Sequence, residues 1–206
     1  MDLIVTACRA LANRARLNLI RAIHAKPGST VNALAKTVRL PPNGTSHHLK
    51  LLGNFHFVQC IPSGRYVRYR PAKPSHISND FLRAMLAYLH NTLGGLNPTP
   101  HEVWDSAARK KQDAELVNVF TTYTHLRRLL VLRQLVLKGS RTSVELAALV
   151  GMSDSAINRH LAKLHRRGVV RAAGAPPYTW QIETDMPPLR QNLLRIVVDV
   201  LQTNRP

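Results

Sequence analysis

Two short segments of this chain carry side chains of the kind that hydrogen-bond to the edges of base pairs. The first segment, residues 42–53, contains Asn43, Thr45, Ser46, His47 and Lys50. The second segment, residues 154–167, contains Asp154, Ser155, Asn158 and Arg159. Asparagine addresses adenine and arginine addresses guanine through paired hydrogen bonds, each worth about 1–3 kcal/mol of discrimination. If both segments are helices, these side chains lie opposite the leucines that face a core, and the competing interpretation is an ordinary solvated helix face.

Both segments belong to a longer pattern that occurs twice in the chain. Residues 48–52 (HLKLL) recur as residues 160–164 (HLAKL), about 112 residues later. The same offset, without gaps, pairs Arg16-Leu17 with Arg128-Leu129, Leu34-Ala35 with Leu146-Ala147, Val38 with Val150 and Val58 with Val170. Chance identities between apolar helices would not keep one register over such a length. We therefore predict a tandem duplication, with an N-terminal domain over residues 1–97 and a C-terminal domain over residues 98–206.

The charge of the chain predicts an anionic partner. Its 206 residues carry 29 Lys and Arg against 11 Asp and Glu, a net charge of +18 at pH 7. Asp2 and Asp80 are the only acids among the first 100 residues. Such an excess favours a nucleic acid as the partner, ahead of an anionic membrane surface.

The cysteine count and the hydropathy of the chain point to the cell interior. Two cysteines, Cys8 and Cys60, are too few for a disulfide framework in two domains. The chain begins without a basic segment of the kind that opens a signal peptide, and no stretch is apolar enough to span a membrane. We expect a cytoplasmic, nucleoid-associated protein that does not contact membranes.

The patterns around the two segments predict one order of elements in each copy. In the first copy they predict helices over residues 11–26, 30–38, 42–53 and 78–93, and strands over 57–61 and 65–70. In the second copy they predict helices over residues 126–138, 143–150, 154–167 and 187–203, and strands over 169–171 and 178–182. Leading helices are expected over residues 3–11 and 101–122. The predicted fold is mainly α with small β-hairpin wings, in two winged helix-turn-helix domains.

In such a domain the last helix of the motif reads base edges, and a basic hairpin holds phosphates. The first hairpin has arginines that alternate with apolar residues, namely Arg65, Arg68 and Arg70. The tip of the second hairpin lacks arginine, so we expect nearby residues to contact phosphate, namely Arg166, Arg167 and Arg171. His48 and His160 share the repeat register, and for each a half-buried structural role and a phosphate contact are both open.

Three motifs of the first copy carry a resemblance to a known family. Residues 11–20 (LANRARLNLI), 45–52 (TSHHLKLL) and 64–69 (GRYVRY) are similar to the opening helix, recognition helix and wing of the ArsR-type winged-helix repressors. The resemblance covers about residues 7–93, and the second copy keeps the same skeleton with more divergence. It implies a sequence-specific transcriptional regulator of the repressor kind that binds double-stranded DNA.

The resemblance also implies an internal pseudo-dimer. Members of the family are typically homodimers joined through their first and last helices. In a fused pair, residues 3–11 and 78–93 would pack against residues 101–122 and 187–203. Because the reading helices differ, the preferred site would have two unlike half-sites about one helical turn apart. Whether two chains associate further stays open.

The chain departs from the family at its sensor positions. The Cys-x-Cys pair with which many members bind metal is missing from residues 31–38. His76, Asp80, His90 and Asp199 lack the spacing of the other common metal site. We therefore expect no metal and no cofactor. The sequence also lacks phosphate-binding, dinucleotide-binding and metalloprotease motifs, so we expect no enzyme activity.

Other functions fit tandem winged helices and a high positive charge. One is a plasmid or phage replication initiator, or a sequence-tolerant architectural DNA-binding protein. Another is a module that binds RNA or a protein. A regulator should prefer one site over random DNA by about 10³-fold or more, whereas an architectural protein should bind with salt-sensitive, sequence-independent affinity.

Overall fold

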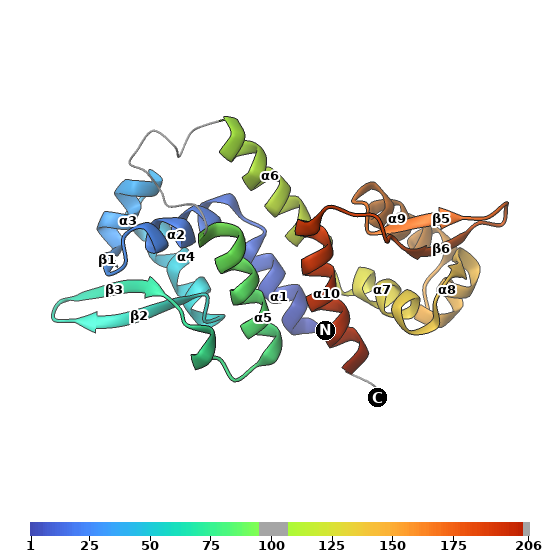
Figure 1. Ribbon diagram of the computed structural model, residues 1–206, viewed down its shortest axis with the longest axis horizontal. Helices are drawn as coiled ribbons and strands as arrows, with labels where there is room; N and C mark the ends of the chain where they lie inside the picture. The colour runs from blue at the N-terminus through green and yellow to red at the C-terminus, as the bar shows by residue number, and fades with distance from the viewer. Residues whose placement is uncertain (95–106, 204–206) are drawn as a thin grey trace. The chain divides into compact units, whose positions relative to one another are not determined.

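The computed structural model describes residues 1–94 and 107–203. Over these residues the protein is mainly helical, with two three-stranded antiparallel sheets (Figure 1). The helices and strands occur in the same order in two successive stretches of the chain. These stretches are called the first module, residues 14–94, and the second module, residues 126–203.

The first module begins with a three-helix motif and ends with a hairpin and a trailing helix. Its elements are α2 (Arg14–Ala25), β1 (Ser29–Thr30), α3 (Val31–Val38), α4 (Pro42–Asn54), β2 (Val58–Ser63), β3 (Tyr66–Pro71), the 3-10 turn η1 (Pro74–His76), α5 (Asp80–Leu89) and the π-helical turn η2 (His90–Gly94). Asn13 and Thr30 start α2 and α3, because their side chains accept hydrogen bonds from the backbone N–H groups of Arg16 and Ala33. Strand β3 lies between β1 and β2.

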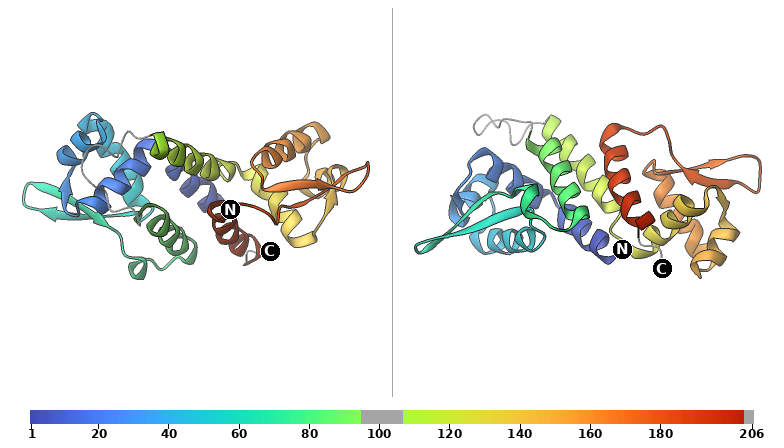
Figure 2. Two further views of the ribbon diagram at one scale, coloured as in Figure 1. Left: turned by 45° about the horizontal axis from the view of Figure 1, so that its top comes forward. Right: turned by 60° about the horizontal axis from the view of Figure 1, so that its bottom comes forward.

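The second module repeats this order. Its elements are α7 (Leu126–Lys138), β4 (Arg141–Thr142), α8 (Ser143–Val150), α9 (Asp154–Arg166), β5 (Val170–Ala173), β6 (Thr179–Ile182) and α10 (Pro188–Thr203). Strand β6 lies between β4 and β5. Figure 2 shows the hairpin of each module extending away from the helices of the same module. The predicted fold class of two winged helix-turn-helix domains is therefore confirmed.

The repeat is a repeat of the core. Each module buries six leucines that the 112-residue offset relates, Leu17 with Leu129, Leu34 with Leu146, Leu49 with Leu161, Leu52 with Leu164, Leu82 with Leu194 and Leu89 with Leu201. The turn before each reading helix is also shared. Arg39 and Gly151, related by the same offset, both have left-handed backbones, with φ of 55° and 65°. Glycine adopts this conformation without the steric cost that arginine bears.

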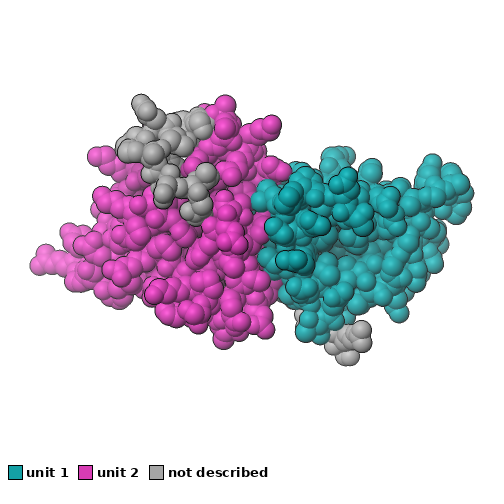
Figure 3. Space-filling model, viewed as in Figure 1, with its two compact units in different colours: residues 1–9, 118–206 teal, residues 10–117 magenta. Residues whose placement is uncertain are grey.

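Two further helices precede the modules, α1 (Asp2–Leu11) and α6 (Ala107–Thr122). By its contacts the chain divides into unit 1, residues 1–9 with 118–206, and unit 2, residues 10–117 (Figure 3). Each unit contains one module. The proposed domain boundary between residues 97 and 98 lies outside the described residues, as does the first part of the helix predicted over 101–122.

Helices α1 and α6 each contribute residues to both units, and each is bonded to the rest of a unit. In unit 1, Arg9 Nε donates a hydrogen bond to the carbonyl oxygen of Thr124 over 3.0 Å. Both cysteines are free thiols, with Cys8 buried and Cys60 exposed. Burial raises the pKa of the Cys8 thiol.

A buried ion pair joins α2 and α6 within unit 2. Arg21 Nη1 contacts Asp113 Oδ1, and Arg14 Nε lies 3.4 Å from Asp113 Oδ2. The side chains of Arg21 and Asp113 are only 2% and 1% exposed. A buried charge is tolerated only when it is paired, so this contact fixes α6 against α2.

Replacing Asp113 with asparagine should destabilise unit 2 strongly. The variant leaves the Arg21 charge buried without its counter-ion, which costs about 3–5 kcal/mol of unfolding free energy. Asp80→Asn is the control, because the Asp80–Arg83 ion pair, at 2.9 Å, is exposed and contributes little. Urea denaturation measures both variants. Equal, small effects would contradict the structural role given to Asp113.

Candidate nucleic-acid interface

The first reading helix, α4, begins at two prolines. Pro41 is its N-cap residue and Pro42 its first helical residue, where the missing N–H costs no intrahelical hydrogen bond. Leu49 and Leu52 are completely buried beneath the helix. The side chains exposed on the opposite face are Asn43, Ser46, His47 and Lys50. The structure thus brings four of the five side chains expected on this helix to one solvent-facing surface.

Thr45, the fifth, lies on the buried face instead. Its side chain is 0% exposed, and its hydroxyl donates a hydrogen bond to the carbonyl oxygen of Pro41 over 3.1 Å. Thr45 precedes Leu49 by four residues and so continues the apolar stripe of the helix. The burial of Thr45 corrects the expectation that it addresses bases. Its hydrogen bond to Pro41 instead holds the first turn of α4 in place.

The second reading helix, α9, follows a strongly capped helix. At the start of α8, Thr142 and Glu145 form a capping box, and the hydrogen bonds from Thr142 lower the pKa of the Glu145 carboxyl. On α9, Leu161 and Leu164 are completely buried. The exposed side chains are Asp154, Ser155, Asn158 and Arg159, which are all four that were expected.

An arginine of the first helix of each module lies close to a histidine of the reading helix. Arg16 Nη1 lies 3.5 Å from His48 Nδ1 in the first module. In the second module Arg128 and His160 are 7% and 8% exposed, and the ring of His160 lies 5.1 Å from that of His125. These positions favour a structural role for both reading-helix histidines over a phosphate contact.

In the second module the pKa values of both His160 and Arg128 are lowered. Burial, followed by the nearby His125 and Arg128, lowers the pKa of His160 to about 4. Burial and the charge of Arg167 lower the pKa of Arg128 to about 10. His160 is therefore neutral near pH 7, and its protonation would add a charge beside other cations.

The first wing is a hairpin of two six-residue strands, braced by one of its own arginines. Strands β2 and β3 pair from Val58 opposite Pro71 to Ser63 opposite Tyr66. The guanidinium of Arg68 donates hydrogen bonds to the carbonyl oxygen of Gly28 over 3.0 Å and to Ser63 Oγ over 3.2 Å. Two wing arginines, Arg65 and Arg70, are exposed beside it.

The second module presents less positive charge around its wing. Arg166 is exposed at the end of α9. Arg171 is also exposed, but its Nε lies 3.7 Å from a carboxylate oxygen of Glu183. A pairing of this kind reduces the charge that the side chain can offer to a phosphate.

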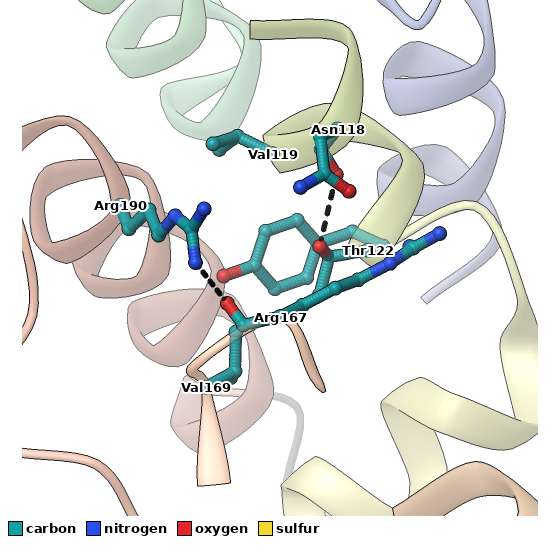
Figure 4. A pocket seen from close by; sticks show the side chains of 7 residues that line it. Asn118, Val119, Thr122, Arg167, Val169 and Arg190 are labelled. Atoms are coloured by element: carbon teal, nitrogen blue, oxygen red, sulfur yellow. Dashed lines mark hydrogen bonds between the residues drawn. The ribbon is translucent and has the colours of Figure 1, made fainter. Parts of the chain in front are cut away.

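Arg167 does not lie on the exposed surface where phosphate contacts were expected. It is half-buried and lines a small pocket with Asn118, Thr122 and Arg190 (Figure 4). Its Nη1 atom is buried, and its carbonyl oxygen accepts a hydrogen bond from Arg190 Nη1. Burial and the charge of Arg166 lower its pKa. The backbone of Arg167 therefore links the end of α9 to α10 inside unit 1, and its half-buried side chain is less exposed than expected of a phosphate contact.

Comparison with known families agrees with this geometry. Residues 125–172 match the family model of the bacterial regulatory protein, arsR family, and residues 11–52 match that of a helix-turn-helix domain. Two helix-turn-helix modules therefore lie in tandem in the chain, and the second matches the arsR family model. No curated protein and no solved structure matched it.

The resemblance seen in the sequence is thereby confirmed, with one difference in its location. The motifs that suggested it lie in the first module, yet the arsR model matches the second, from the N-cap of α7 into β5. The general helix-turn-helix match in the first module runs from the end of α1 into α4. Although the second copy differs more from the family in its motifs, it keeps the residue pattern that the arsR model matches.

Two features of these modules were not predicted from the sequence. The short strands β1 and β4 complete the sheets, but two residues give no periodic signal. The clusters around Arg16 and Arg128 were not anticipated either. Their signal was present, because this arginine and its partner histidine are both identical between the copies at one offset.

Within residues 1–94 and 107–203, no group of three His, Cys, Asp or Glu side chains is placed to hold a metal ion. Over the same residues no helix is both long and apolar enough to cross a membrane.

The buried histidine of the second module should make stability depend on pH. The pKa of His160 is about 4 in the folded chain and about 6.5 when unfolded. The unfolded state therefore binds the proton first, and unfolding free energy falls as pH drops from 6.5 toward 4, by up to about 1.4 kcal/mol per pH unit. Between pH 7 and pH 5 the unfolding free energy of His160→Gln should fall less than that of the wild type, as denaturation at the two pH values would show. His47→Gln, at an exposed site, is the control, and an equal loss in both variants would contradict this assignment.

Proposed function

We propose that this protein is a sequence-specific regulator of transcription, acting as a repressor, whose two modules bind double-stranded DNA together. The observation that carries the proposal is the pair of reading helices. Each buries its leucines and exposes a set of hydrogen-bonding side chains, and the two sets differ. Polar side chains on a helix of this motif are suited to base edges in the major groove.

The two modules are proposed to contribute differently. The first combines exposed cations on its helix and wing, Lys50, Arg65 and Arg70, with a stretch of sequence nearly free of acids. It would supply most of the attraction to phosphate, which is sensitive to salt and indifferent to sequence. The second has Asp154, Asn158 and Arg159 on its reading face. Their groups suit cytosine, adenine and guanine respectively, so this module would discriminate between bases.

We further propose that one chain takes the place of the homodimer that ArsR-type regulators typically form. The support is the duplication itself, together with a leading helix before each module. The proposed domains are residues 1–97 and 98–206. Two unlike reading helices held by one chain would favour two unlike half-sites about one helical turn apart. Such a protein would work at the nucleoid in the cytoplasm.

Selection of bound sequences from a random duplex pool tests this function. At about 150 mM salt, a regulator should enrich one motif with two unlike half-sites and bind it about 10³-fold more tightly than a scrambled duplex. Tight binding without an enriched motif, lost as salt rises, would instead identify an architectural protein. Enrichment of a single half-site would contradict the joint action of the two modules.

Two substitutions should separate base reading from phosphate contact. Asn158→Ala should cost about 1–3 kcal/mol on the selected site, relax the preference at one position and leave binding to scrambled DNA nearly unchanged. Arg65→Gln should weaken both duplexes alike and reduce the salt slope by about one. Arg195→Gln, an exposed change on α10, is the control. An equal loss on both duplexes from Asn158→Ala would remove that residue from the reading set.

A further inference from the structure

The first module contains a cleft that the proposed DNA contacts do not explain. Its volume is about 600 Å³, within the range of about 300–1,000 Å³ that is usual for small-molecule sites. It lies within unit 2, between the end of α2, the β2–β3 hairpin, the segment that follows β3, and the start of η2. The basic and imidazole side chains that line it are His24, Arg70, Lys73, His76 and His90.

The rest of the lining gives the cleft an apolar wall. Two residues come from one face of the hairpin, Gln59, which pairs with Arg70 across the strands, and Ile61. The apolar residues around them are Pro27, Pro71, Ala72 and Pro74. None of the described residues that line the cleft is acidic. The cleft therefore offers positive charge and apolar surface together, which is the chemistry of a site for an amphipathic anion.

Two histidines in the cleft have polar atoms that lack a partner. The rings of His24 and His90 meet edge to face with centroids 4.7 Å apart. The Nε2 atoms of both are buried, and neither has a hydrogen-bond partner among the described residues. Buried polar atoms in folded proteins are nearly always paired, so these two nitrogens mark a place for a ligand atom.

The protonation of these rings decides which ligand atom suits them. Burial, and then the neighbouring His90, lowers the pKa of His24 to about 4, and burial lowers the pKa of His90. Both rings are therefore neutral near pH 7, where each has one nitrogen that donates and one that accepts. A carboxylate oxygen can accept from a ring N–H, and the fork of a guanidinium can hold the same carboxylate through two parallel hydrogen bonds.

We propose that this cleft binds a small organic anion, a monocarboxylate with an apolar body. Arg70 and the ring nitrogens of His24 and His90 hold the carboxylate. The apolar body lies against Ile61 and the prolines of the wall. Of the residues that line the cleft only Arg70 is also a proposed DNA contact, so binding of the anion is a function additional to the reading of DNA.

Occupancy of the cleft would also affect the wing. Arg70 is one of the exposed wing cations, and a carboxylate that pairs with it withdraws that charge from phosphate. The ligand should therefore lower the affinity of the first module for DNA. This consequence rests on the proposed function, whereas binding of the anion does not.

The test is a titration of the full chain, without DNA, followed by imidazole NMR of its histidines. The probes are a panel of aryl and alkyl monocarboxylates, each matched with its own primary amide, together with inorganic phosphate. At least one carboxylate should shift the resonances of His24 and His90 to saturation, and its amide should bind at least about tenfold more weakly. Assignments come from His24→Gln and His90→Gln.

Variants of two wing arginines show whether the site is the cleft. Arg70→Gln should weaken binding of that carboxylate about tenfold. Arg65→Gln, the same change in the turn of the hairpin outside the cleft lining, should leave it unchanged. The proposal is overturned if no carboxylate saturates these shifts, if the amides or phosphate bind equally well, or if both variants weaken binding alike.

A DNA titration with and without the active carboxylate separates the two proposals. Reduced affinity in its presence, lost in Arg70→Gln, supports the coupling through the wing. Unchanged affinity with a saturated cleft overturns the coupling. A chain that binds the carboxylate and no DNA would contradict the regulator while leaving the anion site established.

Discussion

The burial of two leucines on each reading helix is the constraint on which the rest of the arrangement depends. Leu49 and Leu52 on α4, and Leu161 and Leu164 on α9, are completely buried at a spacing of three residues. Each buried leucine contributes about 1.5–3 kcal/mol, more than a solvent-exposed polar contact does. With 3.6 residues per turn, fixing these positions inward leaves a defined set of side chains facing out. The polar face is therefore set by the core before any ligand is present.

This constraint explains which parts of the fold and site could be predicted from the sequence. The limits of α7 and α8 agree with the predicted helices, because apolar periodicity and the residues that end helices are local signals. Two site residues are less exposed than predicted, because side-chain type is a poorer guide to exposure than position. Thr45 satisfies its hydroxyl with a carbonyl one turn earlier, and so it can be buried without an unpaired polar group. Arg167 has a long apolar stem, which lets a charged residue lie along a protein interior.

The features that could not be predicted are those that depend on residues distant in the sequence. Arg21 and Asp113 are 92 positions apart, and no local pattern indicates that two isolated charges will be buried together. Strands β1 and β4 exist because a neighbouring hairpin offers hydrogen bonds to two residues. The offset between the copies is the one long-range signal that the sequence contains. It relates Arg16 to Arg128 and His48 to His160, positions that the structure places in corresponding clusters.

Duplication within one chain lets the two reading helices change independently, which a homodimer does not allow. In a homodimer both reading helices have the same sequence, so any change that improves one half-site contact also alters the other. Here the cores stay equivalent while the surfaces have diverged. Arg39 stands where the second copy has Gly151, and Arg171 pairs with Glu183 while Arg70 lies in a cleft without acidic residues among its described lining. Because the buried leucines keep both scaffolds intact, the exposed positions are free to specialise. One module can favour attraction to phosphate and the other can favour discrimination among bases, which is the division of labour that the proposed function assigns to them.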